Sequence, residues 1–146
     1  MKNKLQIVFL CTGNSCRSQM GEGWARHLYG DHVDVYSAGT HPHGLNPLAV
    51  KVMAEAGVDI SGHSSNHVDD LKHIPLDLAV TVCDRAQETC PVFPGAAKTI
   101  HHSFDDPPQL AKEAPSEEEA LKHYRRVRDE IKEFVQNLKL DMEKTK

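Results

Sequence analysis

Short apolar runs and helix-like stripes alternate along this chain. The apolar runs Leu5–Leu10, Val33–Ser37 and Leu76–Val82 are typical of strands that are buried within a parallel sheet. Lys98–His101 has a weaker pattern of the same kind and predicts a fourth strand. The strands are spaced so that a helix can form in each long interval between them.

Helical periodicity fills these intervals, and capping residues, prolines and glycines mark the helix ends. The predicted helices are Ser18–Tyr29, a helix that starts at Pro47 and stops at Gly57, a short helix at 84–89, and a long helix from the capping box at Ser116 to about Leu140. The polar, proline-rich stretch 104–115 predicts a loop.

Strands that alternate with helices predict an α/β fold with right-handed crossovers. We expect a single domain over residues 1–146, with three layers and a four-stranded parallel sheet in the order 2-1-3-4 flanked by helices. The first and third strands are then neighbours, about 4.8 Å apart. Ligands of such sheets bind at the carboxyl ends of the strands, where Cys11 and Cys83 both lie.

The segment Cys11–Ser18, here called the anion loop, joins the first strand to the first helix and carries the clearest chemistry. Its backbone N–H groups can converge on a tetrahedral oxyanion, and the start of the helix adds donors and a positive dipole end. Arg17 can grip two oxygens at once. The same field favours the thiolate of Cys11, which is the nucleophilic form. The loop therefore predicts an oxyanion site with a nucleophile in it.

A buried structural role is the alternative for a cysteine at a strand end. The surrounding strand, helix and arginine favour catalysis for Cys11. Cys16, one residue before Arg17, is expected to face the core, and for this cysteine the structural role is preferred.

A second cysteine pair, Cys83 and Cys90, allows a metal site or a redox site. The cysteines lack the short spacing of structural zinc sites, and no histidine spacing supplies the missing ligands. If residues 83–90 were helical, the two Cα atoms would lie about 10 Å apart, whereas a disulfide needs them within about 7 Å. A Cys83–Cys90 bond would then require the segment to unwind, which favours a redox switch.

Asp105 and Asp106 precede two prolines and also allow two interpretations. One is a solvated turn, in which Asp-Pro pairs are common. The other is a carboxylic acid above the anion loop that protonates a leaving oxygen. From the residues alone both interpretations stay open.

Composition narrows the function classes. The net charge is −4, from 17 basic and 21 acidic residues, so nothing points to nucleic acid or an acidic membrane surface. The sequence shows no signal peptide and no apolar stretch long enough to span a bilayer, which predicts a cytoplasmic location. Cysteines in such a reducing compartment favour catalytic, redox or metal roles over a disulfide framework.

Taken together, the chain resembles the thioredoxin-coupled arsenate reductases of the low-molecular-weight tyrosine phosphatase superfamily. The resemblance covers nearly the whole chain. The stretches that carry it are Phe9–Met20, Glu22–Ala25, Val35–Gly39, His43–Pro47, Val80–Cys83, Cys90-Pro91, Phe104–Pro107 and Arg126–Ile131.

The resemblance implies a role for each matching residue. Cys11 would attack arsenate, Asp106 would be the general acid, and Cys83 and then Cys90 would complete a disulfide relay that thioredoxin reduces. No bound cofactor is needed, because the electrons come from thiols, and we expect a monomer. The implied substrate-binding residues are Thr12, Gly13, Asn14, Ser15, Cys16, Arg17 and Ser18, with Arg17 binding oxygens and Ser18 stabilising the thiolate.

The sequence departs from the family pattern in two places. Members with a structural potassium ion use residues that match Asn14, Glu22 and Ser37 plus an acidic residue, and here the last position is the neutral Asn66. This weakens the case for a bound cation, and no metal is expected. His102-Ser103 also replaces an aromatic-glycine pair.

Two other functions are alternatives to arsenate reduction. A tyrosine phosphatase on the same fold would use Cys11, Arg17 and Asp106 without the other cysteines. Phosphatases of this type have an aromatic residue where this chain has Pro108, so we expect at most a weak phosphatase side activity. A thiol redox sensor would need the cysteines but neither Arg17 nor Asp106.

Overall fold

The four strands form one parallel sheet, as predicted. The computed structural model describes residues 5–14, 16–42, 44–83 and 96–138. The strands are β1 (Leu5–Leu10), β2 (Val33–Ala38), β3 (Leu78–Thr81) and β4 (Lys98–His101), in the order β2-β1-β3-β4. The predicted α/β class and strand order are therefore confirmed. The predicted strand 76–82 is shortened at both ends, because only residues 78–81 pair with β4.

The helices follow the prediction with two corrections. The long helices are α1 (Arg17–Tyr29), α2 (Pro47–Glu55) and α4 (Glu117–Gln136), and short 3₁₀ segments occur at Gly30–His32 and Val68–Leu71. Helix α4 ends before Leu140, because Asn137 caps it. The stretch predicted as a loop contains α3 (Pro107–Ala111), since a proline is well suited to the first helical position. The segment predicted as a short helix at 84–89 and the predicted Cys90 site both lie outside the described residues.

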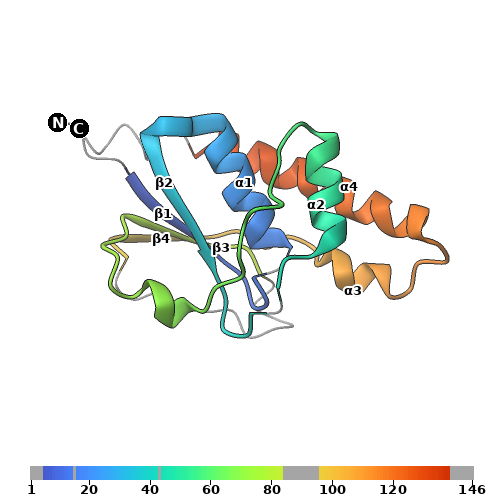
Figure 1. Cartoon of the computed structure of the whole chain (residues 1–146), viewed down its shortest axis with the longest axis horizontal. Helices are drawn as coiled ribbons and strands as arrows, with labels where there is room; N and C mark the ends of the chain where they lie inside the picture. Colours follow the sequence, from blue (N-terminus) through green and yellow to red (C-terminus); the bar gives the residue numbers. More distant parts are fainter. Residues whose placement is uncertain (1–4, 15, 43, 84–95, 139–146) are drawn as a thin grey trace.

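Two apolar clusters cover the two faces of the sheet. The larger cluster joins one face to the main helices, and Figure 1 shows α1, α2 and α4 gathered on that side. The smaller cluster includes Val8, Leu10 and Ala79 from the strands and Val68 and Leu71 from the second 3₁₀ segment. The central strands are thus buried on both faces, which explains their continuous apolar runs.

Side chains cap two of the helices where the sequence places capping residues. Asn46 Oδ1 accepts from the backbone N–H of Leu48 at 2.8 Å and of Ala49 at 3.2 Å. Ser116 Oγ accepts from the N–H of Glu119 at 3.3 Å. Such caps are worth about 1 kcal/mol each. Among the described residues, no helix is both long enough and apolar enough to cross a membrane.

Candidate functional site

Cys11 and Cys83 lie at the same edge of the sheet, as predicted. Cys11 directly follows β1 and donates its N–H to the carbonyl of Ala38 at the end of β2. The neighbouring strand β3 ends at Thr81; the next residue, Val82, donates its N–H to the carbonyl of Leu10, and Cys83 follows it. Both cysteines are buried in the main core cluster. Cys11 is a free thiol, and Cys83 is disulfide-bonded.

The start of α1 is built to receive an anion. Cys16 is its N-cap residue, no side chain caps it, and its first turn holds no acidic residue. The first N–H groups of a helix have no intrahelical partner, and the dipole is positive at this end. Such a helix start can attract an anion through local donors, although the chain as a whole is acidic.

Arg17 ties the anion loop to the segment that follows β4. It is the first residue of α1 and is only 3% exposed. Its Nη1 donates to the carbonyl of Phe104 at 3.1 Å, and its Nη2 lies 3.7 Å from Asp106 Oδ1. Asp105 instead pairs with Arg126 on α4 at 2.9 Å and is largely exposed. The structure thus brings Asp106, and not Asp105, to the anion loop.

The loop itself is held in an unusual backbone shape. Asn14 has φ of 46°, in the left-handed region that few residues other than glycine adopt. A left-handed residue in a loop lets successive N–H groups converge into a concave anion site. Ser18 Oγ donates to Asn14 Oδ1 at 2.8 Å, so its one proton is directed at Asn14. Ser18 can stabilise the Cys11 thiolate by donation only after that hydroxyl rotates.

The remaining loop residues are placed as follows. Thr12 accepts the N–H of His41 on its carbonyl at 2.9 Å, and Gly13 accepts the Ser65 hydroxyl at 3.4 Å. Ser15 lies outside the described residues.

Cys16 lies in the core, as predicted. It is 3% exposed, and burial raises the pKa of its thiol well above the ordinary value; Cys11 acts in the same direction and Arg17 opposes it. Burial likewise raises the pKa of the nearby Tyr124 to about 12, and its hydroxyl accepts from Asn46 Nδ2. Both groups are therefore protonated at neutral pH, so Cys16 is a poor nucleophile.

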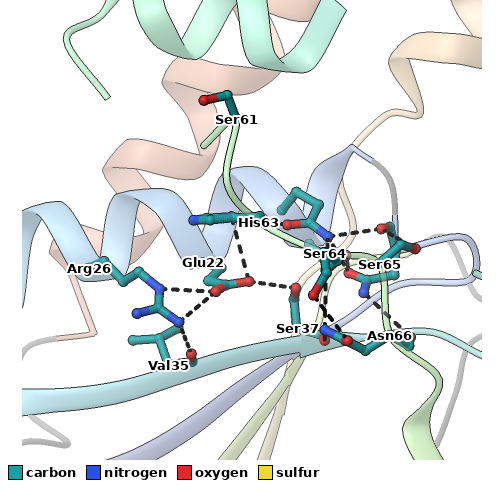
Figure 2. Close-up of polar contacts among 12 residues, drawn as sticks. Glu22, Arg26, Val35, Ser37, Ser61, His63, Ser64, Ser65 and Asn66 are labelled. Carbon is teal, nitrogen blue, oxygen red and sulfur yellow. Dashed lines mark hydrogen bonds and ion pairs between the residues drawn. The ribbon is translucent and has the colours of Figure 1, made fainter. Parts of the chain in front are cut away.

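Figure 2 shows a polar cluster around Glu22, between α1 and β2. Glu22 Oε2 accepts from Arg26 Nε at 3.0 Å and lies 2.8 Å from Arg26 Nη2, while Oε1 accepts from Ser37 Oγ at 2.6 Å. Asn66 turns its N–H₂ group into this cluster and donates to the carbonyls of Ser37 and Ser64.

These contacts bear on the potassium site that the family resemblance implies. A potassium ion is bound by oxygen atoms, but Asn66 presents a nitrogen donor where the family has a carboxylate. Arg26 already supplies the positive charge beside Glu22. The pairing of Glu22 with Arg26 and the neutral side chain of Asn66 weaken the case for a bound cation, and the absence of a metal stays a prediction.

Three residues near the loop were not identified from the sequence: Gln19, His63 and Ser65. Ser65 Oγ donates to the carbonyl of Asn14 at 3.0 Å, and Gln19 contacts Asn14 from α1. For Gln19 the available signal was a polar residue directly after the anion loop, at the start of the predicted helix. His63 and Ser65 lie in a polar stretch that no sequence pattern links to the loop.

The chain is similar to proteins of one known family. A family model described as low molecular weight phosphotyrosine protein phosphatase matches residues 6–146. The chain belongs to this family. Its similar relatives include "Arsenate reductase" of Bacillus subtilis (strain 168), 51% identical over 140 residues, covering 93% of this chain and 98% of that protein. "Arsenate reductase 2" of Staphylococcus epidermidis is 46% identical over 137 residues, covering 94% and 98%.

Solved structures agree with this assignment. "An arsenate reductase in the phosphate binding state" superposes with a TM-score of 0.77 at 29% identity, covering 100% of both chains. The family resemblance and the fold predicted from the sequence are both confirmed.

Proposed function

We propose that this member of the phosphatase family reduces arsenate to arsenite, with Cys11 as the nucleophile. One observation carries the proposal: β1 and β3 are adjacent parallel strands that lead to Cys11 and Cys83 at one edge. Arg17 and Asp106 lie at the same edge. A phosphatase needs the nucleophile, the arginine and the acid, whereas a second buried cysteine beside them suits a reductase. The names of the similar relatives support the same choice.

The proposed first step is attack by the Cys11 thiolate on arsenic. An S–As bond forms, one As–O bond breaks, and Asp106 gives its proton to the leaving oxygen. Arg17 balances the charge of the remaining oxygens.

The reduction step transfers two electrons to arsenic. The Cys83 thiolate attacks the sulfur of Cys11, the S–As electron pair stays with arsenic, and arsenite leaves. Cys90 then attacks Cys83, which frees Cys11 and leaves a Cys83–Cys90 disulfide. A thioredoxin dithiol reduces this disulfide and becomes a disulfide itself. No bound cofactor is required.

The test is arsenate-dependent oxidation of NADPH with thioredoxin and thioredoxin reductase in excess. We expect turnover by the wild type and none by Cys11→Ser. Cys90→Ser should stop after one arsenite per enzyme with a Cys11–Cys83 disulfide, which peptide mapping identifies. A Cys90→Ser enzyme that continues to turn over would exclude the three-thiol relay.

Two further assays separate this function from the phosphatase and the redox sensor. A phosphatase would hydrolyse para-nitrophenyl phosphate with normal activity in Cys83→Ser and would not oxidise NADPH with arsenate. We expect some hydrolysis, since phosphate and arsenate share shape and charge. It should be weak, because Pro108 stands where phosphatases of this type have an aromatic residue. A redox sensor would form its disulfide with peroxide and show no dependence on arsenate or on Arg17.

A further inference from the structure

Gln19 is a polar side chain enclosed in the protein interior. It lies in the first turn of α1 and is 0% exposed. A buried carboxamide is costly unless its donors and acceptor are hydrogen-bonded. The chemistry of the anion loop described above does not use this residue, so its contacts need an explanation.

The contacts of Gln19 define how its carboxamide is oriented. Nε2 lies 3.1 Å from the Asn14 carbonyl, 3.3 Å from Asn14 Oδ1 and 3.0 Å from the Ser64 carbonyl. All three are acceptors, so the nitrogen must face them and Oε1 must face His63 Nδ1, 3.1 Å away. His63 therefore carries a proton on Nδ1. Figure 2 shows His63 and Ser64 on the segment that passes beside α1.

The electrostatic surroundings of His63 agree with this orientation. Burial lowers the pKa of His63; Arg26 acts in the same direction, and the carboxylates of Glu22 and Asp59 oppose it. The neutral ring has a single proton; Gln19 Oε1 lies 3.1 Å from Nδ1, closer than Glu22 Oε1 at 3.7 Å.

These contacts converge on Asn14, the residue that gives the anion loop its shape. Asn14 is 0% exposed and adopts φ of 46°. Its carbonyl accepts from Gln19 and from Ser65, and its side-chain oxygen accepts from Gln19 and Ser18. Gln19 is the one side chain among these that bonds both the backbone and the side chain of Asn14. It thereby resists rotation of the peptide group that follows Asn14.

We propose that Gln19 is a positioning residue for oxyanion binding: braced by His63 and Ser64, its carboxamide holds Asn14 in the left-handed conformation that shapes the anion loop. The inference rests on the proposed function only in that the loop binds arsenate-like anions. Gln19 touches no reacting atom. Its loss should weaken anion affinity and the arsenate KM, since the N–H groups would have to be ordered when the anion binds.

The test compares Gln19→Met with wild type and with Val52→Ala. Methionine keeps the length and volume of the side chain but donates no hydrogen bonds. Val52→Ala removes buried methyl groups on α2 and is the control for a loss of stability. The probe is inorganic phosphate, titrated by calorimetry into the reduced, folded proteins, followed by kcat and KM for arsenate.

We expect roughly tenfold weaker phosphate binding and a similarly raised arsenate KM in Gln19→Met, from the loss of two buried hydrogen bonds at the loop. The Val52→Ala protein should bind phosphate like the wild type. If Gln19→Met fails to fold, Ser65→Ala removes a single donor to the Asn14 carbonyl and should weaken binding severalfold.

Two results have different meanings. Phosphate affinity in Gln19→Met or Ser65→Ala equal to that of the wild type would overturn the positioning role. A wild-type protein that binds neither phosphate nor arsenate would overturn the oxyanion site itself, and with it the proposed function.

Discussion

Gly39 is the residue that brings the end of β2 into contact with the start of the anion loop. A Cβ built at this position would lie 2.4 Å from the carbonyl oxygens of both Cys11 and Thr12. Gly39 cannot easily retreat, because its N–H bonds the carbonyl of Asn66 and its own carbonyl accepts the N–H of Val68. In Gly39→Ala the strain must therefore be relieved largely by displacing the anion loop.

The size of the displacement follows from these contacts. Contacts to Cβ atoms need at least 3.0 Å and are relaxed at 3.4 Å, so the loop carbonyls must move by 0.6–1.0 Å. Overpacking of this kind costs about 1–3 kcal/mol, or about 4–12 °C in Tm for a domain of this size. A misplacement near 1 Å at a catalytic site can cost about 100-fold in rate. We expect kcat/KM to fall far more than the loss of folded protein explains.

Gly62→Ala is the matched control, because a Cβ at Gly62 meets nothing within 4 Å. Thermal melts followed by circular dichroism, with arsenate reduction measured well below both midpoints, separate stability from catalysis. A Gly39→Ala enzyme that is fully folded at the assay temperature and retains wild-type kcat/KM would refute this reasoning.

Three further changes test the site and the fold. Asp106→Asn should slow the single-turnover reduction of arsenate by about 100-fold or more while arsenate still binds, since the amide cannot act as the acid. Asp105→Asn loses only a surface ion pair with Arg126 and should react at nearly the wild-type rate. The reverse ranking of the two rates would move the acid role to Asp105. Cys16→Ala should lower the free energy of unfolding by about 1 kcal/mol in chemical denaturation yet retain turnover, and a folded but inactive variant would contradict its structural role. Ser116→Ala should cost about 1 kcal/mol of stability by the same assay, and an unchanged midpoint would show that α4 does not depend on this cap.

The sequence predicted the sheet and the position of the anion loop between a strand and a helix, because both are local patterns. The apolar run Leu5–Leu10 and the helix after it place Cys11 at a strand end, and the same reasoning places Cys83 at the next strand. The proline-rich stretch was assigned to a loop, although Pro107 begins a short helix.

The support of the loop could not be predicted in the same way. Gln19 contacts Ser64 and His63, which are more than forty positions away in the sequence, through hydrogen bonds that depend on how the segment after α2 passes beside α1. The ion pair between Glu22 and Arg26 follows from helical spacing, and the sequence can suggest it. The hydrogen bond from Ser37 on β2 to Glu22 is a tertiary contact, which the sequence alone does not show. Such residues look like ordinary polar positions until the fold is known.

The uncapped start of α1 has a thermodynamic consequence. A helix that begins at Cys16 without a side-chain cap lacks about 1 kcal/mol that a serine or aspartate would contribute there. An oxyanion bound at this end fills the role of the missing cap, so occupancy and folding are linked. A ligand at a hundred times its Kd raises the unfolding free energy by about 2.7 kcal/mol. The protein should therefore melt at a higher temperature in phosphate than in chloride at equal ionic strength, with the empty site as a weak point of the fold.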